Sequence, residues 1–121
     1  MKTHLQGDAF VVIDDAILDQ QVIQIKVKKD WRTIEPYMTG LDRNSLKSVV
    51  YGFCRDVVPS LSYPSRWKCF DLDDIDAVEV TNYSFDPHID YEGENDCMLT
   101  VYRKLKPAWT SEESVHLCIA G

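Results

Sequence analysis

Short apolar segments separated by polar turns dominate this chain, and they restrict its fold more than any other feature. Residues 21–28 show the clearest pattern, because Ile23, Ile25 and Val27 alternate with polar residues as in a strand with one wet face. A second strand is expected at residues 9–13, and the two strands are expected to form an antiparallel hairpin in which residues 14–20 make a turn or a single helical loop. By composition or alternation, the other expected strands are residues 66–72, 77–85, 97–105 and 115–119.

One segment has the period of a long helix. Over residues 46–58, apolar side chains recur at i, i+3, i+4, i+7, i+8, i+11 and i+12, which predicts an amphipathic helix opened by Asp42 or Asn44. A short or broken helix is also expected at residues 31–35, before Pro36. This order predicts an α+β domain with a mainly antiparallel sheet of about five to six strands and the long helix packed on one face. A parallel α/β fold would need more helices than the chain can supply.

Turn-forming residues mark the expected connections. Loops are predicted at residues 59–65, 86–96 and 106–114, and an acidic turn at residues 73–76. Within the strand at residues 77–85, a bulge near Asn82 would bring aromatic side chains to the core face.

Composition indicates a single globular domain over residues 1–121, with 45% hydrophobic and 27% charged residues. The apolar runs are too short to span a bilayer, and the first eight residues lack the apolar stretch of a signal peptide. We therefore expect a cytoplasmic protein with no membrane partner. The four cysteines, Cys54, Cys69, Cys97 and Cys118, form no C-x-x-C pair and are expected to be free, mostly buried thiols.

Negative charge is concentrated in one part of the chain. Residues 70–102 contain ten of the twenty carboxylates and no Lys or Arg, while the net charge of the whole chain is −7. A clustered field steers an oppositely charged molecule, and it disfavours nucleic acid as a partner. The ten residues are Asp71, Asp73, Asp74, Asp76, Glu79, Asp86, Asp90, Glu92, Glu94 and Asp96.

Signatures of catalysis and of cofactor binding are missing from the sequence. It has no G-x-S-x-G, Walker A, dinucleotide-binding or H-E-x-x-H motif, so we expect neither catalytic residues nor a cofactor. A cysteine paired with His88 or His116 is conceivable for a hydrolase, but no spacing favours it. An EF-hand beginning at Asp71 is excluded, because its sixth position is Asp76 and its twelfth is Asn82. No dedicated metal site is expected, and weak calcium binding by the acidic segments stays an alternative.

A basic row is predicted on the outer side of the long helix. Arg43, Lys47, Tyr51 and Arg55 follow one another at four-residue steps. Such a row is typical of the wet face of an amphipathic helix. As a functional alternative, it would grip an acidic partner, as in a phage-type regulator or an accessory subunit that binds a host protein.

The acidic segment predicts recognition of a basic protein surface, with Tyr91 as an aromatic anchor. In size, charge and lack of catalytic motifs, the chain is similar to bacterial immunity proteins, which neutralise toxins that include basic nucleases. That resemblance implies a non-enzymatic inhibitor that occludes a basic partner, and it carries over no residue roles. An enzyme of unrecognised type is the third alternative. The predicted partner-binding residues are Asp73, Asp74, Asp76, Asp86, Asp90, Tyr91, Glu92, Glu94 and Asp96.

Overall fold

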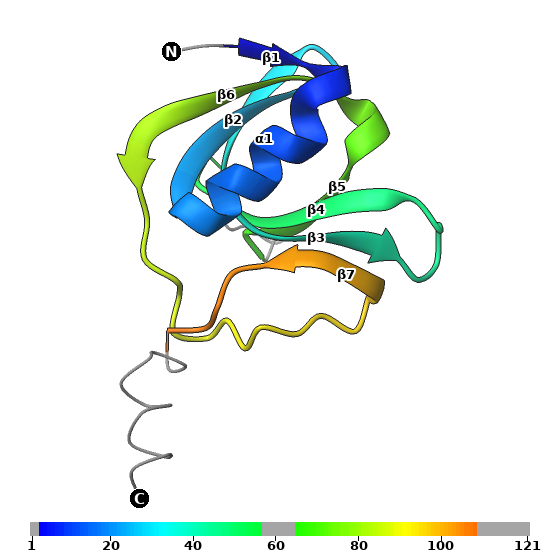
Figure 1. Ribbon diagram of the computed structural model, residues 1–121, viewed down its shortest axis with the longest axis vertical. Helices are drawn as coiled ribbons and strands as arrows, with labels where there is room; N and C mark the ends of the chain where they lie inside the picture. The colour runs from blue at the N-terminus through cyan, green and yellow to red at the C-terminus, as the bar shows by residue number, and fades with distance from the viewer. Residues whose placement is uncertain (1–2, 57–64, 109–121) are drawn as a thin grey trace, which may run out of the picture.

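A computed structural model of the chain describes residues 3–56 and 65–108, which form one antiparallel sheet with one α-helix beside it (Figure 1). The sheet order is β1-β6-β2-β3-β4-β5, and β7 pairs with β3. The predicted α+β class with an antiparallel sheet is confirmed. In chain order the elements are β1 (Thr3–Leu5), α1 (Gln6–Asp19), β2 (Gln21–Val27), β3 (Asp30–Asp42), β4 (Ser48–Cys54), β5 (Trp67–Asp71), the 3-10 helix η1 (Leu72–Asp74), β6 (Ile75–Ser84) and β7 (Met98–Lys104).

Strand β3 is central to the sheet, because two different strands pair with the same edge of it. Its first half pairs with β2 up to Ile34, and its second half pairs with β7 from Met38 onward. Strand β4 runs along the other edge, with a register shift between Pro36 and Met38. Proline has no N–H to donate to a ladder, so a bulge at this point is expected. The bulge places Tyr37, which is fully buried, where the two halves of the sheet diverge.

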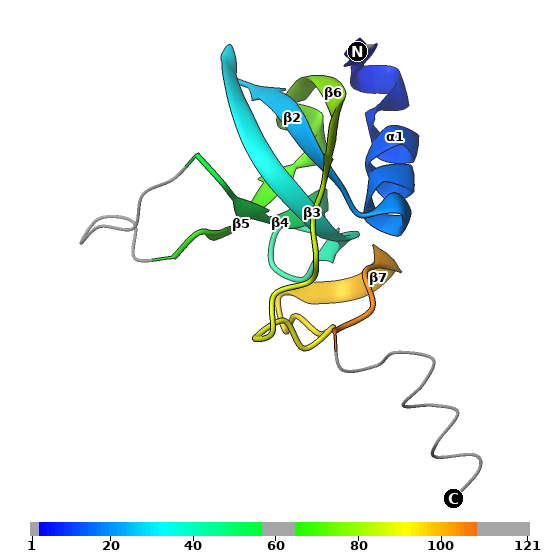
Figure 2. The same cartoon turned by 90° about the vertical axis from the view of Figure 1, so that its left-hand side faces the viewer.

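Helix α1 packs across one face of the sheet, against β6, β3 and β2 (Figures 1 and 2). Its buried residues Ala9, Ile13, Ala16 and Ile17 follow helical spacing. The strand predicted at residues 9–13 and the hairpin through residues 14–20 are therefore wrong. A five-residue apolar run does not distinguish a strand from a helix, and the helical period emerges only when the later residues are included.

Burial of the Asp14 carboxyl group between α1 and β3 makes the stability of the protein depend on pH. Asp14 Oδ1 accepts a hydrogen bond from Thr39 Oγ1 at 2.7 Å, and burial raises the pKa of Asp14 above its ordinary value of 3.8. Because the folded state binds this proton more readily than the unfolded state, the associated stability is present below pH 3.8 and is lost as the pH rises through the raised pKa.

We expect Asp14→Asn to keep the acceptor for Thr39 and to remove this loss of stability. The unfolding free energy of the variant relative to wild type should rise between acidic and neutral pH in urea titrations. Asp19→Asn is the matched control, because it removes the same charge from an exposed position of the same helix and Asp19 is not among the groups that shift the Asp14 pKa. If the Asp14→Asn variant lost as much stability as wild type between acidic and neutral pH, Asp14 would not be the source of the pH dependence.

The long helix predicted between Asp42 and residue 58 is also wrong, since residues 48–54 form strand β4. An interior strand carries apolar residues on both faces, and the resulting short runs imitate a helical period. Asp42 still acts as a cap, but it closes the β3–β4 turn by accepting hydrogen bonds from the N–H groups of Asn44 and Ser45. The short helix predicted at residues 31–35 belongs to β3, so the only α-helix among the described residues is α1, with 14 residues.

Several other predictions are confirmed. The strands expected at residues 21–28, 66–72, 77–85 and 97–105 correspond to β2, β5, β6 and β7. A bulge occurs around Asn82, where the pairing of β2 with β6 jumps from Val80 to Ser84. It buries Phe85, as expected, but leaves Tyr83 70% exposed.

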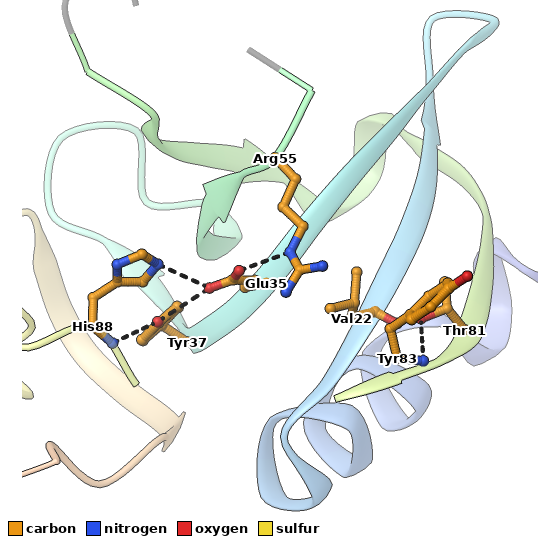
Figure 3. Close-up of polar contacts among 7 residues, drawn as sticks. All are labelled: Val22, Glu35, Tyr37, Arg55, Thr81, Tyr83 and His88. Atoms are coloured by element: carbon orange, nitrogen blue, oxygen red, sulfur yellow. Dashed lines mark hydrogen bonds and ion pairs between the residues drawn. The ribbon is translucent and has the colours of Figure 1, made fainter. Parts of the chain in front are cut away.

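Thr81 bridges the two strands at this bulge (Figure 3). Its hydroxyl donates to the carbonyl oxygen of Val22 at 2.7 Å and accepts from the backbone N–H of Tyr83 at 3.1 Å. The predicted strand at residues 115–119, Cys118 and most of the loops at 59–65 and 106–114 lie outside the described residues. Of the free cysteines that are described, Cys54 is buried, whereas Cys69 and Cys97 are exposed. No helix in the described ranges is both long and apolar enough to cross a bilayer.

Candidate functional site: an anchored acidic loop

Residues 86–96 connect β6 to β7 without regular secondary structure, as predicted, and we call them the acidic loop. The loop runs along the end of the sheet beside β7 (Figures 1 and 2). A long connection on a rigid scaffold is a common place for a binding function. Its exposed carboxylates are Asp86, Asp90, Glu92, Glu94 and Asp96.

The other predicted acidic residues lie elsewhere. Asp73 and Asp74 belong to η1, and Asp76 lies near the start of β6. Strand β6 separates η1 from the acidic loop, and its ten residues span roughly 33 Å at about 3.3 Å per residue. Figures 1 and 2 show the two segments at opposite ends of the sheet. The predicted partner-binding residues are therefore divided between two places and do not form one face.

The first half of the acidic loop is attached to β3 through His88 (Figure 3). The backbone N–H of His88 donates to Tyr37 Oη at 3.0 Å, and its ring Nε2 lies 3.1 Å from Glu35 Oε1. The imidazole also packs on Phe53, with 4.1 Å between ring centroids. Backbone and side chain of one residue thus hold the loop against the sheet.

Glu35 is the centre of this attachment. It is only 5% exposed, and its carboxylate accepts hydrogen bonds from Arg55 Nε at 2.8 Å and from Tyr37 Oη at 3.3 Å (Figure 3). A buried charge is tolerated only when it is paired in this way. We call Glu35, Tyr37, Arg55 and His88 the anchor network. The sequence analysis misses it, because it expects Glu35 in a short helix, and because Arg55 and His88 lie 20 and 53 positions away from Glu35.

The second half of the loop has its own attachments. The Tyr91 hydroxyl donates to the carbonyl oxygen of Leu105 at 2.8 Å, and Lys104 Nζ donates to that of Gly93 at 3.2 Å. Gly93 has φ +82°, a conformation that favours glycine. Near the loop end, the N–H of Met98 donates to the Asn95 carbonyl at 3.0 Å. The loop is therefore held along its length while its carboxylates face solvent.

Aromatic side chains form the wall between the loop and the sheet. Tyr37 contacts Trp67 and Tyr91 edge to face, with 4.7 Å between centroids in each pair. Tyr91 is 4% exposed, so it cannot insert into a partner as the predicted anchor would, but it can line a pocket. Burial raises the pKa of Tyr91 to about 12, so this phenol keeps its proton and its hydrogen bond at neutral pH.

The predicted basic row does not exist as one face. Arg43 and Lys47 lie in the β3–β4 turn, Tyr51 lies in β4, and Arg55 follows β4. Each charged member has an intramolecular contact: Arg43 with the carbonyl oxygens of Asp96 and Met98, Lys47 with Asp71, and Arg55 with Glu35. Arg43 contacts the acidic loop, Arg55 belongs to the anchor network, and Lys47 pairs with Asp71 of β5; the helix that was expected to carry the basic row does not form.

Metal binding and thiol catalysis have little geometric support among the described residues. No group of three or more His, Cys, Asp or Glu residues able to hold a metal ion occurs in the described ranges. Burial raises the pKa of the Cys54 thiol, which disfavours the nucleophilic thiolate. No significant match was found when the chain was compared with models of known protein families, with curated proteins and with solved structures.

Proposed function

We propose that this protein is a non-enzymatic binding domain whose acidic loop docks on a basic surface of another protein. In this proposal it acts as an inhibitor or immunity protein in the bacterial cytoplasm and occludes a nuclease-like partner. One observation carries the proposal: the loop presents five exposed carboxylates, yet it is attached to the sheet at His88, Tyr91 and Gly93.

An anchored loop is suited to binding because its ordering cost is met when the protein folds. Association otherwise loses free energy for each side chain and loop segment that becomes ordered at the interface. Exposed carboxylates add electrostatic steering, which raises association rates for a partner of opposite charge. The proposal uses the acidic loop and omits Asp73, Asp74 and Asp76, because η1 and the start of β6 lie at the opposite end of the sheet.

We expect charge removal in the loop to slow association with the basic partner. The loop variant carries Asp90→Asn, Glu92→Gln and Glu94→Gln. A protein captured from an extract of the source organism would be purified, and its association with each form measured by biolayer interferometry. At about 0.05 M salt the loop variant should associate roughly tenfold more slowly than wild type, and the difference should shrink near about 0.5 M salt.

The matched control removes three exposed carboxylates outside the acidic loop, at Asp15, Asp19 and Asp30. This control variant has the same net charge as the loop variant and should associate nearly as fast as wild type. Capture alone does not support the proposal, since the rate must depend on the position of the charges. Equal rates for all three forms, or a captured partner that is acidic, would sink it.

A further inference from the structure

A small pocket lies under the acidic loop, where the loop meets β4 and β5. Its volume is about 240 Å³, and Tyr51, Trp67, Asp90, Tyr91, Glu92 and Glu94 line it. Pockets for drug-sized molecules usually measure about 300–1,000 Å³. This pocket therefore suits a single side chain rather than a larger ligand.

Aromatic rings form the walls of the pocket. Tyr51 and Trp67 are stacked, with 5.3 Å between ring centroids and 15° between ring planes. Trp67 and Tyr91 are also nearly parallel, at 6.3 Å and 18°. The face of an aromatic ring carries negative electrostatic potential, so a cation that lies against an exposed part of one of these rings is attracted to it.

The charged residues that line the pocket are all acidic. Asp90, Glu92 and Glu94 are exposed, and no Lys, Arg or His is among the lining residues. The nearby cation Lys104 donates to the carbonyl oxygen of Gly93. Aromatic faces and carboxylates are independent features, and both select a positively charged group.

We propose that this pocket binds the guanidinium group of an arginine side chain that the protein partner presents. The inference rests on the proposed function, because it names the group that the acidic loop recognises. Arginine fits better than lysine for two reasons. Its planar guanidinium stacks on aromatic faces and is weakly hydrated, and its donors match a carboxylate in a bidentate arrangement.

The pocket walls are supported from behind, which favours a preformed site. Tyr37 packs edge to face on both Trp67 and Tyr91, and the Tyr91 hydroxyl is bonded to the Leu105 carbonyl. The wall residues are therefore in place before the ligand arrives. Binding then needs only small movements of the exposed carboxylates.

The test is a titration of the full chain with N-acetyl-arginine methylamide. In a Trp31→Phe, Trp109→Phe background, the fluorescence reports on Trp67 alone. We expect saturable binding with a dissociation constant of about 1–10 mM. The lysine analogue should bind at least about threefold more weakly, and the neutral citrulline analogue should not bind.

Further variants separate the contribution of the aromatic walls to arginine binding from that of the carboxylates. Tyr51→Leu should weaken arginine binding about fivefold, whereas Tyr51→Phe keeps the ring and should bind like wild type. The loop variant should also lose binding, while the control variant with Asp15, Asp19 and Asp30 neutralised should keep it. Circular dichroism checks that each variant is folded.

The proposal is overturned by several results: no saturation at about 50 mM ligand, equal binding of the arginine and citrulline analogues, equal binding of arginine and lysine, or equal weakening by the control variant. Failure of the pocket is distinguishable from failure of the proposed function. If the arginine analogue does not bind but a basic partner still associates at a loop-dependent rate, only the pocket assignment falls. If the analogue binds but no partner depends on the loop, only the proposed function falls.

Discussion

Replacement of Tyr37 by alanine is expected to lower the free energy of unfolding by about 4 kcal/mol, the largest effect of any change considered for this protein. Tyr37 is fully buried at the bulge of β3, and its ring contacts Trp67, Phe85 and Tyr91. Removal of the ring leaves a cavity where the acidic loop, β3 and β5 meet. Urea unfolding measures the loss.

The hydroxyl of Tyr37 is tested separately by Tyr37→Phe. This change keeps the ring but removes the donor to Glu35 and the acceptor for the His88 N–H, and it should cost about 1–2 kcal/mol. Hydrogen exchange at the His88 amide should become faster, because that amide has lost its acceptor. Tyr102→Phe is the control, since Tyr102 is 41% exposed and should change stability little. Equal effects at Tyr37 and Tyr102 would show that Tyr37 does not hold the loop.

Replacement of Glu35 by alanine is expected to cost about 3 kcal/mol, because it leaves Arg55 and His88 without their buried partner. This value is the lower end of the roughly 3–5 kcal/mol that the loss of one partner of a buried ion pair usually costs. The side chains of Arg55 and His88 are 40% and 35% exposed, so water can solvate them. Glu35→Gln should cost less, because the amide oxygen still accepts the Tyr37 hydroxyl. Chemical unfolding with hydrogen exchange over residues 86–96 measures both the stability and the release of the loop.

An ion pair with a more exposed carboxylate provides the comparison. Arg32 Nε lies 3.1 Å from Asp56 Oδ2, and both side chains are partly exposed. Asp56→Ala should cost about 1 kcal/mol or less and leave exchange in the acidic loop unchanged. If Glu35→Ala resembled Asp56→Ala in both measurements, the anchor network would not be the structure that positions the loop.

Local pattern was reliable where a strand has one polar face and failed where both faces are covered. Residues 21–28 alternate because solvent reaches one side of the strand, and β2 was predicted correctly. In β4 both Val50 and Tyr51 pack against other elements, so alternation disappears and the spacing imitates a helix. The run at residues 9–13 failed in the opposite direction, because it is too short to reveal the period of α1.

In the candidate site too, one part has a local signal in the sequence and the other part has none. The acidic loop was predicted as an exposed polar connection, because Pro87, Gly93 and its carboxylates disfavour regular structure. The anchor network had no local signal. Glu35 and His88 are 53 positions apart, and only the folded sheet brings their side chains within 3.1 Å.

The sequence by itself determined the antiparallel α+β class, the concentration of negative charge and the position of the acidic loop, since these follow from composition and short-range pattern. Only the tertiary structure decided which carboxylates share a surface. The length of strand β6 keeps η1 and the acidic loop apart. Near Tyr37, one edge of β3 changes its pairing partner from β2 to β7, and this change brings β4, β5 and the loop together. Both results depend on strand pairing between distant residues, which local propensities do not encode.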